Sequence, residues 1–191
     1  MGNIIFVFMF ATSFLASIQA QDVRFGLKAG INSANASEAS ATAITSFHVG
    51  GMMEALYADT FALQPEILYS QQGFEMDTET AKERYTFSYI NIPLMFKYVV
   101  VKGIILEAGP QIGYLNTAKL ERQTTEGNAE IDIKDAMSDN DFSLNIGLGF
   151  QTRSGWILNG RYNWGLTNLV KGGLDRQFKV SVLQVSIGYL F

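Results

Sequence analysis

Apolar side chains alternate with small or polar ones along most of this chain, and an alternation of period two predicts β-strands. Apolar residues spaced three or four positions apart, as in amphipathic helices, are scarce after residue 20. Eight segments carry the alternation, at residues 23–32, 45–57, 60–72, 85–99, 104–115, 141–151, 156–165 and 178–191. Pro65 and Pro110 fall inside two of them. Because proline cannot donate to a hydrogen-bond ladder, each predicts a local bulge or a strand end.

The two faces of each predicted strand differ in kind. One face is apolar and ends in aromatic residues, whereas the other is small or polar, as with Gly26, Lys28 and Gly30 in the first segment. Eight such strands fit either a soluble barrel with its apolar face inside or an outer-membrane barrel with that face against lipid. Repeated glycines beside charged residues favour the second, because an eight-stranded barrel is only just wide enough for side chains to fill. We therefore predict an all-β, eight-stranded antiparallel up-and-down transmembrane β-barrel.

The predicted connections alternate in length. Three are short, at residues 58–59, 100–103 and 152–155, and four are long, at 33–44, 73–84, 116–140 and 166–177. Outer-membrane barrels have short periplasmic turns and longer extracellular loops. Because the number of strands is even, the alternation predicts that both termini are periplasmic and that the long loops are outside, where they could bind a protein partner.

Residues 1–20 predict a secretory signal peptide. An unbroken apolar run covers residues 4–11, small residues follow up to Ala20, and the polar pair Gln21 and Asp22 comes next. This order of regions is that of a signal peptide with a cleavage site after Ala20. We therefore expect the barrel domain to occupy residues 21–191.

The composition narrows the choice of protein class. Hydrophobic residues make up 48% of the 191 residues and charged residues 17%, against about 25% charged in a typical soluble domain. After residue 20 there is no apolar run of the roughly 20 residues that a membrane-spanning helix needs. The absence of cysteine excludes a disulfide scaffold and a zinc–cysteine site. The net charge of −4 argues against binding to nucleic acid, and no motif indicates a cofactor.

Four short motifs lie on the first, third, fourth and fifth predicted strands. They are FGLKAGIN at residues 25–32, LQPEILYSQQG at 63–73, YINIPL at 89–94 and AGPQIG at 108–113. Together they resemble the PorT-like outer-membrane β-barrel domain family, although Ala29 stands where that pattern often has glycine. The resemblance implies a small OmpA/OmpX-type eight-stranded barrel in a Gram-negative outer membrane, for most members without a known activity. The family's namesake is linked to a secretion system for surface and exported proteins, so the resemblance points to secretion or surface assembly.

Six charged side chains lie on the polar faces at heights that should overlap inside the barrel. They are Lys28, Glu54, Glu66, Lys97, Glu107 and Arg161. Ionised groups in a narrow lumen must be paired, because an unpaired buried charge is costly. The six therefore predict a plug of salt bridges, with a gated ion path as the sharper alternative.

The last strand alternates up to the terminal carboxylate, with an apolar residue at every second position: Leu183, Val185, Ile187, Tyr189 and Phe191. Outer-membrane barrels commonly end in this way, and the last strand is the signal that the barrel-insertion machinery recognises. We predict this role for the five residues. The simpler interpretation is that the barrel stops at its last strand.

Two further features leave alternatives open. His48 is the single histidine and could act as a general base, but no motif supplies its partners. Residues 116–140 are rich in acidic side chains, yet their spacing does not match an EF-hand, so this segment is either a solvated loop or a site for a partner or a cation.

The most direct hypothesis is a non-enzymatic structural or interaction protein in outer-membrane lipid. The alternatives are a narrow channel and, third, a lipid-modifying enzyme.

Overall fold

The structure is a computed structural model, and it describes residues 22–36, 41–78, 81–124, 127–168 and 179–191. The predicted signal peptide lies outside these residues. The chain forms β1 (Asp22–Ala36), β2 (Ala41–Ala43), β3 (Thr45–Ala58), β4 (Phe61–Thr78), β5 (Ala81–Val101), β6 (Ile104–Thr124), β7 (Gly127–Asp132), the short 3₁₀ helix η1 (Lys134–Ala136), β8 (Asn140–Gln151), β9 (Trp156–Gly165) and β10 (Val180–Leu190).

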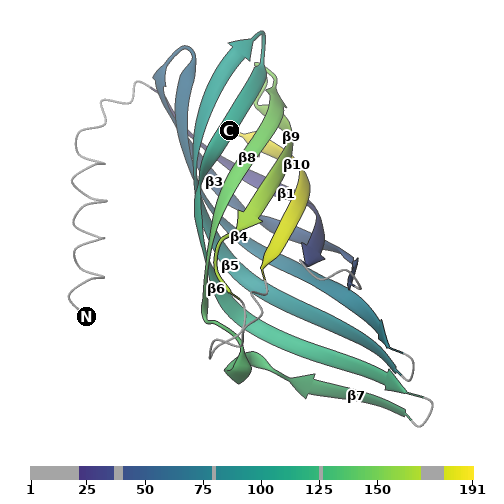
Figure 1. The fold of residues 1–191 in the computed structure, drawn as a ribbon. Coiled ribbons are helices and arrows are strands. Elements are labelled where there is room, and N and C mark those ends of the chain that lie inside the picture. Colours follow the sequence, from purple (N-terminus) through teal and green to yellow (C-terminus); the bar gives the residue numbers. More distant parts are fainter. Residues whose placement is uncertain (1–21, 37–40, 79–80, 125–126, 169–178) are drawn as a thin grey trace, which may run out of the picture.

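Eight of these strands close into a ring. Neighbours pair antiparallel in the order β1, β3, β4, β5, β6, β8, β9 and β10, and β10 pairs with β1 to complete the circle. The short strands β2 and β7 lie outside the ring and pair with β4 and β6. The ring confirms the predicted eight-stranded up-and-down barrel. Figure 1 shows it with the short turns at one end, and with β5, β6 and β7 reaching far beyond the other end.

The strand boundaries differ most from the prediction at the end of the barrel with the long connections, here called the long-loop end. The predicted loop 73–84 is wrong, because β4 and β5 stay paired up to Thr78 and Ala81. The predicted loop 116–140 is wrong in part, since β6 continues to Thr124 and β7 returns along it. Residues 33–36 extend β1, and 41–43 form β2. The apolar alternation that marked the strands ends before the backbone pairing does.

Neither proline that the sequence singled out breaks its strand. Pro65 pairs with Leu94, and Pro110 pairs with Leu144, without a shift of register at either position. The prediction of a local bulge or a strand end at these prolines is therefore wrong. A proline removes one ladder donor, and the pairs on both sides hold the register. The register shifts lie elsewhere, for example where Ser88 and Tyr89 of β5 meet β6.

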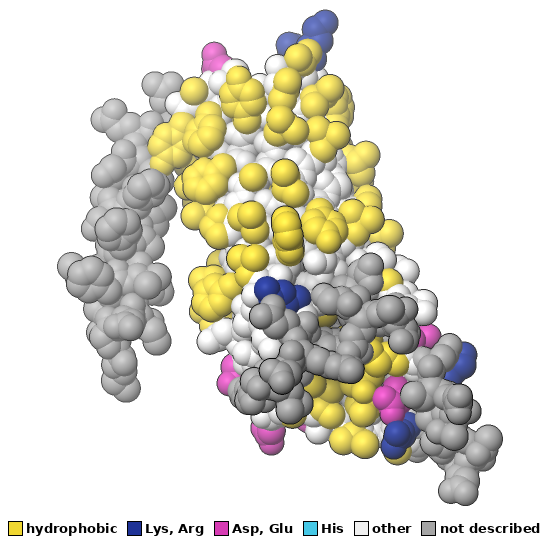
Figure 2. Space-filling view, in the orientation of Figure 1, with side chains coloured by type: hydrophobic (Ala, Val, Ile, Leu, Met, Phe, Trp, Pro, Cys, Tyr) yellow, Lys and Arg dark blue, Asp and Glu magenta, His cyan; other side chains and the backbone are white. Residues whose placement is uncertain are grey.

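The outward face forms a broad apolar band around the barrel. Its exposed residues include Phe25, Leu27 and Ile31 on β1, and every second residue of β8 from Phe142 to Phe150. Figure 2 shows this band at mid-height, with charged side chains gathered toward the two ends. Ala55 and Leu63, which the alternation places on the same face, are buried at 1% and 8% exposure, and they pair with each other across β3 and β4. Among the described residues there is no candidate for a membrane-spanning helix.

Candidate functional site

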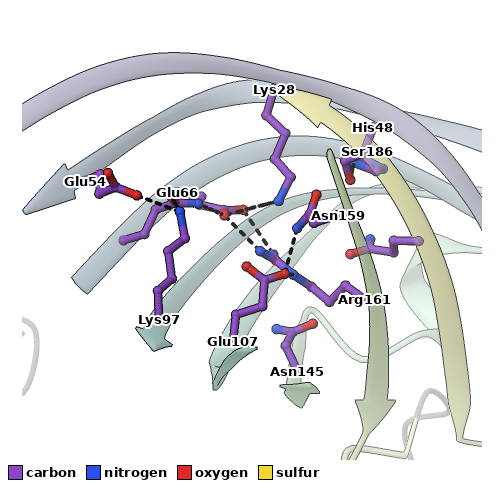
Figure 3. A network of polar contacts seen from close by, with 12 residues as sticks. Lys28, His48, Glu54, Glu66, Lys97, Glu107, Asn145, Asn159, Arg161 and Ser186 are labelled. Atoms are coloured by element: carbon purple, nitrogen blue, oxygen red, sulfur yellow. Dashed lines mark hydrogen bonds and ion pairs between the residues drawn. The ribbon is translucent and has the colours of Figure 1, made fainter. Parts of the chain in front are cut away.

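The centre of the lumen holds a network of four charged side chains from four strands. The guanidinium of Arg161 on β9 donates two hydrogen bonds to the carboxylate of Glu66 on β4. Nη1 lies 3.1 Å from Oε2, and Nη2 lies 3.0 Å from Oε1. Lys28 of β1 donates to the same carboxylate at 3.2 Å, and the Arg161 Nε donates to Glu107 of β6 at 3.1 Å. Figure 3 shows these contacts converging from opposite walls of the barrel. We call these four residues the deep network; it contains two cations and two carboxylates.

The local sequence makes room for this network. Gly147 of β8 pairs with Glu107, and a Cβ atom at Gly147 would lie 2.7 Å from the Glu107 Oε1. Asn159 of β9 completes the hydrogen bonding of that carboxylate, because its Nδ2 donates to Oε1 at 2.6 Å. The glycines of the inward face thus make space for long neighbours in a barrel that side chains just fill.

A second group of charges lies nearer the end with the short turns, here called the short-turn end. Lys97 of β5 donates to Glu54 of β3 at 2.6 Å, and also to Gln64 and Gln151 at 2.7 and 3.0 Å. Arg24 of β1 donates to the other Glu54 oxygen at 2.5 Å. We call Arg24, Glu54 and Lys97 the shallow network.

The structure brings all six sequence-predicted charges together, because Gln64 joins the two networks. Its Nε2 donates to Glu66 at 2.6 Å, while its Oε1 accepts from Lys97. Sequence reasoning missed Arg24 as a member. The signal was available, since Arg24 lies four residues before Lys28 on the same strand, and residues an even number apart share a face.

His48 lies at the centre of a separate buried hydrogen-bond chain. Its Nδ1 is 2.7 Å from the Asn32 Oδ1, and its Nε2 is 2.8 Å from the Ser186 Oγ. The Asn32 amide nitrogen donates to two backbone carbonyls, so the Asn32 oxygen faces the ring as an acceptor. Nδ1 therefore donates and Nε2 accepts from Ser186. The order Asn–His–Ser is that of a hydrolase triad, but the three residues are 1% to 3% exposed, so a substrate could not reach the hydroxyl.

An apolar layer fills the lumen toward the long-loop end. Its buried members are Ala34, Phe74, Phe87, Tyr89, Leu115, Ala118, Val180 and Val182. The Phe74 ring packs on Tyr85 and Phe87 at centroid distances of 4.9 and 6.1 Å. The lumen thus contains two kinds of filling, a polar network toward the short turns and an apolar core toward the long loops.

The five residues predicted as an insertion signal lie on the outward side of the last strand and at its end. Leu183, Val185 and Ile187 are exposed, and so is Phe191. Tyr189 lies between Trp156 and Phe191, with ring centroids 5.0 and 5.5 Å away. These three rings form part of an aromatic rim at the short-turn end, where interfacial girdles of outer-membrane barrels lie.

Comparison with known proteins identifies the class of barrel. The family described as "Outer membrane protein beta-barrel domain" matches residues 19–171. The attachment invasion locus protein Ail of Yersinia pestis is similar in structure, with a TM-score of 0.53, 11% identity and coverage of 89% of this chain and 99% of Ail. The Neisserial surface protein A is similar with a TM-score of 0.57, 10% identity and coverage of 87% and 97%. No curated protein sequence matches significantly. The chain therefore belongs to the outer membrane protein beta-barrel domain family, and it is an integral protein of the bacterial outer membrane.

Proposed function

We propose that this protein is a plugged outer-membrane barrel that presents a folded interaction platform at the cell surface. The observation that carries this proposal is the continuation of β4, β5, β6 and β7 as paired strands beyond the apolar band. Unstructured loops would suffice to close a barrel. A paired sheet over its own apolar core instead offers a partner a fixed surface.

The proposed orientation places both termini in the periplasm and the platform outside. Its support is the contrast between the tight turns at one end and the long extension at the other, which is the arrangement of bacterial outer-membrane barrels. A peptide epitope inserted at residues 79–80, between β4 and β5, should bind antibody on intact cells. The same epitope inserted at residues 153–154, in a short turn, should bind only after the cells are opened. The reverse result would overturn the orientation.

The plugged state is supported by the two fillings of the lumen. Each charge of the deep network has a partner of opposite sign, and the apolar layer lies beyond it in the described residues. We expect the purified protein to give no steady single-channel current in planar bilayers. Steady currents would favour the narrow channel, which is the competing function.

The platform carries ion pairs between its strands. Arg122 of β6 contacts Glu83 of β5 at 2.9 Å, and Lys119 of β6 contacts Glu130 of β7 at 2.6 Å. We propose that residues 116–140 form the main contact with a partner in secretion or surface assembly, which the PorT-like motifs suggest. In a strain from which the gene for this protein is deleted, the wild-type gene should restore the exported and surface proteins. A variant in which a short turn joins β6 directly to β8 should not restore them. A variant shortened at residues 166–177 is the matched control.

The proposal includes the path to the membrane. Residues 1–20 would be removed on export, and the last strand together with Phe191, which follows it, would be recognised by the barrel-insertion machinery. Deleting Phe191 should lower the amount of folded barrel in cells, while the purified variant still refolds in detergent. Equal loss of folding in detergent would show that the residue serves stability alone. We do not propose enzymatic activity, since the Ser186 hydroxyl is buried.

A further inference from the structure

A cavity of about 850 Å³ lies at the short-turn end of the barrel. The charged side chains of its lining are Arg24, Lys97, Lys102, Arg153, Glu54 and Asp59. Lys102 and Arg153 belong to the turns between β5 and β6 and between β8 and β9, and Asp59 belongs to the turn between β3 and β4. Three turns thus surround the mouth, and the shallow network forms part of its wall.

The cavity has an excess of positive charge in a chain whose net charge is −4. The deep network is balanced, with two cations for two carboxylates. In the shallow network, by contrast, the single carboxylate of Glu54 forms ion pairs with both Arg24 and Lys97. The lining also contains Asp59, Lys102 and Arg153, and no ion pair in the described part of the chain involves these three residues. Four basic side chains therefore line the cavity against two acidic ones.

Two details of the cavity favour the binding of an anionic ligand. The hydrogen-bonding capacity of the Arg24 guanidinium is not used up, because its Nε is buried and has no hydrogen-bond partner within the described residues. Lys102 has a φ of 37°, a left-handed conformation, and Gly103 follows with a φ of 91°. A turn of this kind favours Asn-Gly. This turn carries Lys102 in place of the favoured Asn, and so adds an ammonium group to the lining of the cavity.

We propose that this cavity binds a phosphate group carried by a small organic molecule or by a lipid headgroup. A guanidinium group and two or three ammonium or guanidinium neighbours suit the oxygens of phosphate. The volume falls in the range of ligand pockets, about 300–1,000 Å³, so it holds more than the phosphate alone. Leu56, Val99 and Ile105 supply apolar wall for the rest of the molecule.

The binding test uses the purified protein in phosphatidylcholine nanodiscs, titrated with glycerol 3-phosphate and with inorganic phosphate in a calorimeter. We expect saturable binding of glycerol 3-phosphate that weakens at least tenfold in the Lys102→Gln/Arg153→Gln double variant. The matched control is Arg84→Gln/Lys119→Gln, which removes two positive charges at the far end of the barrel. Heat-modifiable gel mobility checks that both variants are folded.

A second arm distinguishes the source of the phosphate. If it belongs to a lipid, nanodiscs with phosphatidylglycerol should abolish the binding of glycerol 3-phosphate, and this effect should disappear in the Lys102→Gln/Arg153→Gln variant. If it belongs to a solute, phosphatidylglycerol should leave the titration unchanged. Arg24→Lys, which keeps the charge but removes the planar guanidinium group, should weaken binding several-fold in either case. Absence of binding in both kinds of nanodisc, or equal weakening in the control variant, would overturn the proposal.

Discussion

Replacing Glu66 by alanine is the most direct test of the deep network. The Glu66 carboxylate accepts hydrogen bonds from Lys28, Arg161 and Gln64, and it is 1% exposed. Without it, Lys28 and Arg161 stay buried at 4% and 1% exposure and share a single carboxylate, Glu107. The variant therefore leaves one positive charge without a partner in the middle of the barrel.

The expected loss of stability follows from that unpaired charge. Removing one partner of a buried ion pair typically costs about 3–5 kcal/mol, because the remaining charge keeps its desolvation penalty without compensation. Urea unfolding of the purified protein in lipid vesicles, followed by heat-modifiable gel mobility, measures the free energy of unfolding. We expect Glu66→Ala to lower it by this amount while the protein still inserts.

Two controls separate this effect from a general effect of the substitution. Glu75→Ala removes one partner of the half-exposed pair with Arg84, at 3.5 Å, and such surface pairs contribute about 0–1 kcal/mol. The double variant Lys28→Met/Glu66→Ala removes one charge of each sign, so Arg161 and Glu107 remain a balanced pair and part of the stability should return. The reasoning fails if Glu66→Ala is no less stable than Glu75→Ala.

Three further changes test other parts of the barrel. Gly30→Ala should strongly reduce refolding yield, because its Cβ would lie 2.6 Å from the His48 ring, whereas Gly160→Ala has open space and should refold like wild type. Ser186→Ala should lower the free energy of unfolding by about 1–3 kcal/mol, because the buried His48 Nε2 loses its donor, and equal urea midpoints would refute this. Burial raises the pKa of the Tyr85 phenol to about 12, from about 10 in an unfolded chain. The associated stability is present below pH 10 and is lost as pH rises toward 12. A Tyr85→Phe variant should therefore resist alkaline unfolding better than wild type, as urea midpoints at pH 9 and pH 11.5 would show.

The strands that cross the apolar band could be predicted because lipid imposes a simple pattern on them. Outward positions are mostly apolar, so the alternation predicts a strand over residues 156–165, the range that the structure assigns to β9. The extension could not be predicted in the same way. Beyond the band the outward face of β4 and β5 carries polar residues such as Glu75 and Lys82, so the apolar alternation that marks the strands is lost there, and the pairing is carried by the backbone.

The residues of the deep and shallow networks could be predicted more easily than the contacts between them. An inward position follows from the parity of the residue number along a strand, which is enough to place Lys28, Glu66 and Arg161 in the lumen. Their contacts join residues 38 and 95 positions apart in the chain. Such contacts depend on the closure of the ring and on the stagger of its strands, and the alternation pattern contains neither.

The polarity of the strands reverses along their length, and this reversal coincides with the end of the outward apolar band. Within the band, Ile90 and Tyr114 face outward and are exposed, while Asn91 and Gln111 face inward. A few residues further on, Phe87 and Ala118 are buried on the inside, and Lys119 is exposed on the outside. Along the same strands, the apolar side chains thus change from the outward face to the inward face. Water on the outside is the physical cause, because a sheet that leaves lipid can hide apolar side chains only within itself. The part of the barrel between Ile90 and the long-loop end therefore has a core of its own, the apolar layer. This core can hold the proposed platform rigid at a distance from the membrane.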